Sequence, residues 1–152
     1  MKQPNSNHCF VCGRNNPYGL HLKFYESSPG EVIVEYTVPE QFQGYPGVVH
    51  GGVVAAILDE VTGRTQMGGD PPRFMFTARL DIRYRKNVPT GKPLKIVGQA
   101  RTRRERTATA SGQIYSPDGE LLAEAEAVLV NVPDDLVNNV DLVELGWKVD
   151  QD

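Results

Sequence analysis

The stretch VVHGGVVAAILDEV, residues 48–61, decides the fold of this chain, because it sets a histidine and two glycines directly before an almost wholly apolar run. Its alanines and the preceding glycines predict a helix over Val53–Thr62, which Gly63 ends. A helix that is apolar on nearly every face must be covered on every side. We therefore expect a buried central helix, and the two acids inside it, Asp59 and Glu60, require an explanation.

The remainder of the chain alternates between apolar and polar residues, as strands do. The pattern predicts two strands before the helix and four after it: Leu20–Tyr25, Glu31–Val38, Phe74–Lys86, Leu94–Arg103, Thr107–Tyr115 and Leu121–Val130. A Ser-Ser-Pro-Gly turn joins the first pair and a Ser-Pro-Asp-Gly turn joins the last. These elements predict an α+β fold in which an antiparallel sheet curls around one helix.

The length of 152 residues suits a single domain with a substantial core. We place the core at about residues 18–132, followed by a polar, acidic tail over 133–152 in which Leu142, Leu145 and Trp147 are possible anchors. The longest apolar run, Val53–Leu58, is too short to cross a bilayer. No apolar signal region follows the first lysine. The expectation is a cytoplasmic protein without a membrane partner.

The formal net charge of −3 hides a basic middle. Between Arg79 and Arg106, ten lysines and arginines face two acids, Asp81 and Glu105, which gives +8. Such a stretch suggests an anionic partner. Tyr84 is its only aromatic residue, so the stacking platform of single-strand nucleic-acid binders is missing. We expect no nucleic-acid partner.

Three segments in order carry a family resemblance: HGGVVAAILDEVTG (50–63), TARLDIRYRKNVPTG (77–91) and RTATASGQIYSPDGELLAEAEAVLV (106–130). Together they resemble the hotdog-fold acyl-CoA thioesterases, in particular the phenylacetyl-CoA-type branch, over roughly residues 18–132. The resemblance implies a sheet wrapped around the central helix, a homodimer or dimer of dimers, and active sites at the interface between paired subunits.

The resemblance also implies roles for individual residues. The acid of the family falls on Asp59, its oxyanion-hole amide on Gly52, its loop histidine on His50 and a small hydroxyl residue on Thr77. The amide side chain that many members place before the histidine has Gln43 as its nearest counterpart, offset by one position.

Thioester hydrolysis explains why these residue types occur here. The reaction needs an activated water and donors for the oxyanion. A helix N-terminus supplies free amides, and Gly51 and Gly52 let a carbonyl approach them without a Cβ in the way. Asp59 lies seven residues after Gly52, about 10 Å along a helix, so either it is not catalytic or it serves a carbonyl bound by another subunit. We expect the second, a site shared between subunits. Both general base and nucleophile remain open as its role.

The basic stretch would bind the phosphates of coenzyme A, which in this interpretation is part of the substrate and not a cofactor. The candidates are Arg85, Lys86, Arg106 and Thr107. Adjacent helical residues point about 100° apart, so Glu60 is expected to make a structural or interface contact in place of a catalytic one.

Two other functions stay open. One is a hydratase or dehydratase of acyl thioesters with the same fold. Such enzymes usually pair a catalytic Asp with a His, and no histidine follows His50 here. The other is a protein that binds acyl-CoA without turnover, which would not depend on Asp59.

Cys9 and Cys12 form a Cys-x-x-Cys motif, with His8 beside it and His21 downstream. A four-ligand zinc site needs further cysteines or histidines, and one half of such a site is a weak signal. We expect a packed segment near the substrate entrance and no metal.

Overall fold

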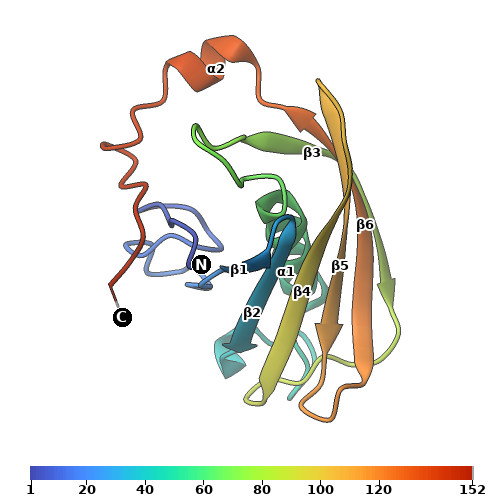
Figure 1. Ribbon diagram of the computed structural model, residues 1–152. Helices are drawn as coiled ribbons and strands as arrows, with labels where there is room; N and C mark the ends of the chain where they lie inside the picture. The colour runs from blue at the N-terminus through green and yellow to red at the C-terminus, as the bar shows by residue number, and fades with distance from the viewer. Residues whose placement is uncertain (152) are drawn as a thin grey trace.

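A computed structural model describes residues 1–151 of the chain, and its main feature is one antiparallel sheet curved around a helix (Figure 1). The helix, α1, spans Gly51–Arg64. The sheet has the strand order β1-β2-β4-β5-β6-β3. The strands are β1 (Tyr25–Ser28), β2 (Glu31–Thr37), β3 (Met75–Tyr84), β4 (Pro93–Arg103), β5 (Thr107–Tyr115) and β6 (Leu121–Asn131). This is the architecture that the sequence predicts.

The helix lies against the concave face of the sheet, where Ile57, Leu58 and Val61 are fully buried. Two strand glycines make this close packing possible. A Cβ on Gly98 of β4 would lie 2.5 Å from the Val61 carbonyl oxygen, and one on Gly112 of β5 would lie 3.2 Å from a Val61 methyl group. The helix therefore approaches β4 and β5 so closely at these two positions that a larger side chain would force a shift.

The predicted helix lies inside α1 but is too short at both ends. His50 is the N-cap, so Gly51 and Gly52 form the first turn. Gly63 does not end the helix, since the chain stays helical through Arg64 and is capped at Thr65. Only one further α-helix follows among residues 1–151, α2 (Asp134–Asn138), and none in this range is long and apolar enough to span a membrane.

The predicted first strand, Leu20–Tyr25, is wrong, because β1 begins only at Tyr25. Leu20, Leu22 and Phe24 are buried in the expected alternation, but they are held by an irregular segment before them. The Leu22 amide donates to the Val11 carbonyl at 2.9 Å, and the Gln3 amide donates to the Phe24 carbonyl at 2.9 Å. The other five predicted strands agree with the structure to within two residues.

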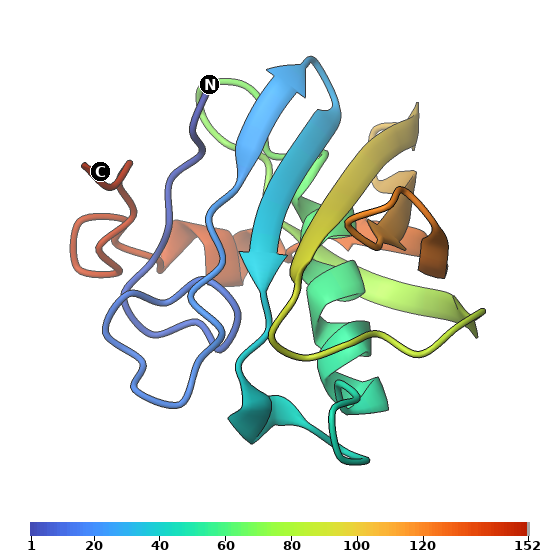
Figure 2. The same ribbon diagram turned by 90° about the horizontal axis from the view of Figure 1, so that it is seen from below.

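The N-terminal segment and the C-terminal tail lie side by side in both views (Figures 1 and 2). The Asn5 amide donates to the Lys148 carbonyl at 2.9 Å. Trp147 packs edge-on against Phe74, with ring centroids 5.2 Å apart, so it is an anchor of the tail as expected. The final residue of the predicted tail, Asp152, lies outside the described residues.

Candidate active site

Asp59 and Thr77 meet between α1 and the edge strand β3. The Thr77 hydroxyl donates a 2.6 Å hydrogen bond to Oδ1 of Asp59. Asp59 is partly exposed and Thr77 is exposed, so the pair lies at the surface of the chain and not in its core. The bond holds one carboxylate oxygen, Oδ1, against β3.

The start of α1 holds the second group of candidate residues. His50 caps the helix, and its Nδ1 accepts a 2.9 Å hydrogen bond from the Gly52 amide. The Tyr84 hydroxyl donates to the Gly51 carbonyl at 2.7 Å. Sequence reasoning missed Tyr84, although its place seven residues after Thr77 on one strand was visible. The Gly52 amide thus has an internal partner, which a thioester oxygen would have to replace.

These two groups lie at opposite ends of the contact between α1 and β3. Asp59 meets Thr77 and Gly51 meets Tyr84, so the helix and the strand run in opposite directions. Seven helical residues between Gly52 and Asp59 correspond to about 10 Å along the axis. One chain therefore does not bring its own Gly52 amide and its own Asp59 carboxylate to the same carbonyl.

Gln43 belongs to the loop that leads into the helix. Its Oε1 accepts a 3.3 Å hydrogen bond from the Gly47 amide, and its backbone bridges to Val49. The His50 amide donates to the Phe42 carbonyl at 2.9 Å. The side chain of Gln43 thus contacts the backbone of its own loop.

The four phosphate candidates form two separate groups. Thr107 pairs with Val130, which also faces Phe76, so Arg106 and Thr107 lie at the same end of the sheet as Thr77. Arg85 and Lys86 follow the other end of β3. Arg85 is 3.0 Å from Glu124, and Lys86 forms an ion pair with Glu120. A single chain does not bring the two groups to one phosphate.

Glu60 faces a different environment from Asp59. Its Oε1 accepts a 2.9 Å hydrogen bond from Nε of Arg64, whose side chain is fully buried. Burial raises the pKa of Glu60, and the positive charge of Arg64 opposes that rise. Glu60 therefore makes the structural contact that the sequence suggests.

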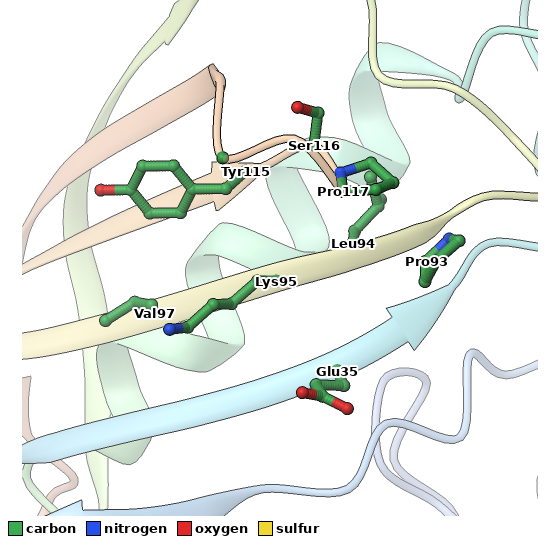
Figure 3. A pocket seen from close by; sticks show the side chains of 9 residues that line it. Glu35, Pro93, Leu94, Lys95, Val97, Tyr115, Ser116 and Pro117 are labelled. Atoms are coloured by element: carbon green, nitrogen blue, oxygen red, sulfur yellow. The ribbon is translucent and has the colours of Figure 1, made fainter.

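A surface hollow of about 610 Å³ lies where β2, β4 and the end of β5 meet (Figure 3). Its polar side chains include Glu35, Lys95 and Ser116, and none of the residues singled out from the sequence lines it. This hollow is therefore separate from the site between α1 and β3.

Known proteins similar to this chain identify its family. The model of the thioesterase superfamily matches residues 46–123, just over half of the chain, a range that includes His50, Gly52, Asp59 and Thr77. Acyl-coenzyme A thioesterase THEM4 of Rattus norvegicus is 28% identical over 116 residues, which are 76% of this chain and 49% of that protein. The Mus musculus protein of this name is 33% identical over 113 residues, 74% of this chain and 48% of that protein. The chain spans about half the length of these curated relatives.

Solved structures agree with the fold. The crystal structure of a thioesterase superfamily protein has a TM-score of 0.75 and 32% identity, covering 82% of this chain and 63% of that chain. A Streptococcus mutans protein solved with acetyl CoA has a TM-score of 0.66 and 21% identity, covering 73% and 88%. The antiparallel sheet around one central helix, together with its match to these thioesterase structures, thus defines a hotdog-fold protein. The chain belongs to the thioesterase superfamily.

Proposed function

We propose that the chain is an acyl-CoA thioesterase, which hydrolyses an aryl- or fatty acyl-CoA to the free acid and coenzyme A. The observation that carries the proposal is the 2.6 Å hydrogen bond from Thr77 to Asp59, two residues that the motif spacing brings together at the family's acid position. The names of the rat and mouse relatives support the same activity.

In the proposed mechanism, Asp59 accepts a proton from water through Oδ2 while Thr77 holds Oδ1. The water oxygen attacks the thioester carbonyl, and the backbone amide of Gly52 donates to the oxyanion that forms. The carbon–sulfur bond then breaks, and Asp59 returns the proton to the departing thiolate. Direct attack by Asp59, with a mixed anhydride hydrolysed afterwards, uses the same geometry.

We further propose that the site is shared by two subunits. The distance of about 10 Å between Gly52 and Asp59 along α1 exceeds the reach of about 3 Å that proton transfer requires. The Asp59 of one subunit would therefore serve the carbonyl held at the Gly52 amide of its partner.

The edge strand β3 offers a surface through which two subunits could pair and share the site. Among residues 1–151, β3 pairs only with β6, so its second edge offers free amides and carbonyls to another strand. Two copies of β3 paired antiparallel about a two-fold axis would set the Thr77 end of one against the Tyr84 end of the other. Thr77 contacts Asp59 and Tyr84 contacts Gly51, so this pairing joins the two halves of the site.

The same pairing would gather the basic residues. Arg106 and Thr107 lie at the Thr77 end of the sheet, and Arg85 and Lys86 follow its Tyr84 end. Across a two-fold axis, one pair from each subunit would therefore meet near one substrate. The acetyl CoA held by the Streptococcus mutans neighbour supports a ligand of this class.

Release of free thiol from a panel of aryl and fatty acyl-CoAs tests the proposal. We expect turnover by the unmodified protein and a loss of about 100-fold or more in kcat for Asp59→Asn, because general base catalysis contributes about 10²- to 10⁴-fold. Asp118→Asn is the matched control, since Asp118 is an exposed residue of the β5–β6 turn, and it should keep full activity.

The outcomes separate the open alternatives. Binding of acyl-CoA without thiol release would favour a non-catalytic binding protein. Addition of water to an unsaturated acyl-CoA, with the thioester left intact, would favour a hydratase. Thiol release that survives Asp59→Asn would remove Asp59 from the mechanism.

A further inference from the structure

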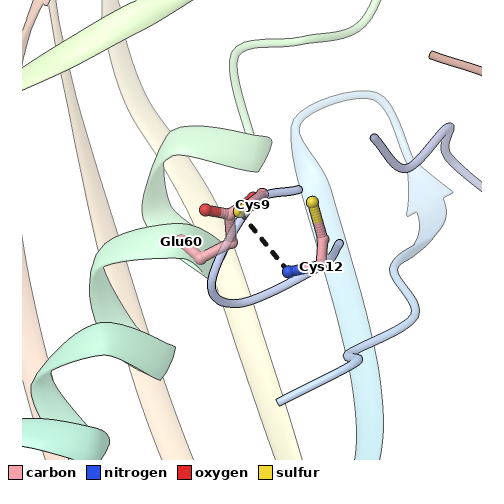
Figure 4. A group of neighbouring side chains, drawn as sticks. All are labelled: Cys9, Cys12 and Glu60. Atoms are coloured by element: carbon pink, nitrogen blue, oxygen red, sulfur yellow. Dashed lines mark hydrogen bonds between the residues drawn. The ribbon is translucent and has the colours of Figure 1, made fainter. Parts of the chain in front are cut away.

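Cys9 and Cys12 meet a third metal-binding side chain that the sequence motif did not reveal. The two sulfur atoms and a carboxylate oxygen of Glu60 all lie within 4.8 Å of one another (Figure 4). The cysteines come from the N-terminal segment and Glu60 comes from α1, so the cluster joins two parts of the chain far apart in sequence.

We infer that Cys9, Cys12 and Glu60 form a binding site for a divalent thiophilic metal ion of the zinc type. Thiolate ligands favour zinc over magnesium or calcium. Three protein ligands leave the fourth tetrahedral position to water. This inference is independent of the proposed hydrolase activity.

The dimensions of the cluster suit such an ion. Zinc binds thiolate sulfur at about 2.3 Å and carboxylate oxygen at about 2.0–2.2 Å, so tetrahedral ligand atoms are about 3.5–3.8 Å apart. Separations of at most 4.8 Å therefore require shifts of about 1 Å, which side-chain rotations of Cys9 and Glu60 can supply.

The backbone of the loop that holds the two cysteines surrounds the sulfur atom of Cys9 with amide donors. The amides of Val11 and Cys12 point at Cys9 Sγ, at 3.3 and 3.5 Å. The Gly13 amide closes the turn onto the Cys9 carbonyl at 2.8 Å, and a Cβ on Gly13 would lie 2.3 Å from that oxygen. Two amides directed at one sulfur stabilise negative charge on it, as a metal-bound thiolate requires.

Buried Arg64 sets the charge and orients Glu60. Arg64 donates to Oε1 of Glu60, to the Pro4 carbonyl at 2.6 Å and to Oδ1 of Asn5 at 3.2 Å, which leaves the second Glu60 oxygen for the ion. Two thiolates and a carboxylate carry −3, a divalent ion brings +2, and Arg64 brings +1. The occupied cluster is therefore neutral, which low-dielectric surroundings favour.

The thiols respond to this environment in opposite ways. A hydrogen bond from Cys9, together with Arg64 and Ser6, lowers the pKa of Cys12 to about 5. The same hydrogen bond, burial and the charge of Glu60 raise the pKa of Cys9. Both sulfur atoms must be thiolates when a metal ion is bound, because the thiolate is the form that coordinates a metal.

The inferred ion would act as a structural link. It would tie the N-terminal segment to α1 one residue from Asp59, with Glu60 about 100° around the helix from that acid. Its expected effect is a higher melting temperature, because binding to the folded chain alone stabilises it.

Metal analysis of reduced protein purified without a histidine tag tests the inference. We expect about one zinc per chain and, after exchange with Co²⁺, sulfur-to-cobalt charge-transfer absorption in the near ultraviolet. Cys12→Ser should abolish that absorption, and Glu60→Gln should weaken Co²⁺ binding about 10-fold or more. Glu31→Gln, which alters a carboxylate hydrogen-bonded by Ser27 far from the cluster, should bind Co²⁺ as the unmodified protein does.

The unmodified protein gives a decisive result even if the cysteine variants fail to fold. Reduced, folded protein that retains no zinc and shows no charge-transfer absorption at saturating Co²⁺ would overturn the inference. A Cys9–Cys12 disulfide whose reduction yields no metal binding would overturn it too. Equal Co²⁺ affinity in Glu60→Gln and the unmodified protein would remove Glu60 as a ligand.

Discussion

Asp59 accepts a hydrogen bond from the hydroxyl group of Thr77 on β3, and a substitution that removes this hydroxyl tests its effect on activity. The hydrogen bond from Thr77 to Oδ1 fixes the carboxylate so that Oδ2 faces a substrate water in the proposed mechanism. We expect Thr77→Val to lower kcat about 10-fold, because a carboxylate that is no longer held in place loses about 1.4 kcal/mol of transition-state stabilisation. Steady-state kinetics with an acyl-CoA substrate measure this decrease in kcat.

Thr77→Ser is the matched variant, since it keeps the hydroxyl and removes only a methyl group. It should retain most of the activity, and both variants should melt close to the unmodified protein because Thr77 is exposed. Equal kcat for the valine and serine variants would show that the hydroxyl has no part in orienting Asp59.

His50 is the cap of α1, and this role predicts an effect on stability. Its Nδ1 accepts from the Gly52 amide, so His50→Ala leaves that amide without its cap. The expected loss is about 1 kcal/mol in the free energy of unfolding, measured by urea denaturation. His50→Asn restores a capping oxygen and should recover most of the loss; a cost shared equally by both variants would point to packing instead.

At this scale the sequence indicated the acid, the helix glycines and Thr77 because their spacing follows one continuous motif. The contact of Tyr84 with Gly51 was not predicted, since a tyrosine at the end of an alternating strand looks like an ordinary edge residue. Glu60 was recognised as structural, but its proximity to Cys9 and Cys12 was not predicted, because only tertiary packing brings together residues about fifty positions apart.

The contact between α1 and the sheet depends on Gly98, and this can be tested at the level of elements. An added Cβ would lie 2.5 Å from the Val61 carbonyl oxygen, so Gly98→Ala must push the helix away from β4. We expect it to lower the free energy of unfolding by about 1–3 kcal/mol, as overpacking does. Denaturant titration gives the value.

Gly63→Ala is the control, at a position of α1 where an added Cβ meets no neighbouring atom. Nothing lies within 4 Å of a Cβ built there, and the position is helical, so alanine should stabilise the protein by about 0.5–1 kcal/mol. Destabilisation by Gly63→Ala, or no cost for Gly98→Ala, would contradict the packing described for α1.

The later strands were predictable because each is nine to eleven residues long with alternating side chains, and β4, β5 and β6 pair with sequence neighbours while β3 pairs with β6. Residues 20–24 alternate equally well but are not a strand. Their partner is an irregular segment, and His21 adopts a left-handed φ of 59°. Alternation reports which side chains are buried, and it does not report which backbone will pair with them.

The whole molecule must pair with a copy of itself if Asp59 is to reach a carbonyl at Gly52, and mixing two inactive proteins tests this. Asp59→Asn removes the acid, and Gly52→Val blocks the approach to the helix amide with a side chain that starts 3.1 Å from the His50 ring. In a two-fold dimer each mixed pair holds one site with both defects and one with neither.

Random exchange of subunits in an equal mixture should therefore restore about a quarter of the unmodified activity, because half of the dimers are mixed and each has one intact site. Mixing without exchange, at low temperature immediately before the assay, should restore none. If the site were complete within one chain, every chain in the mixture would carry a defect and the mixture would stay inactive after full exchange. Recovery near a quarter would thus assign Gly52 and Asp59 of one site to different subunits.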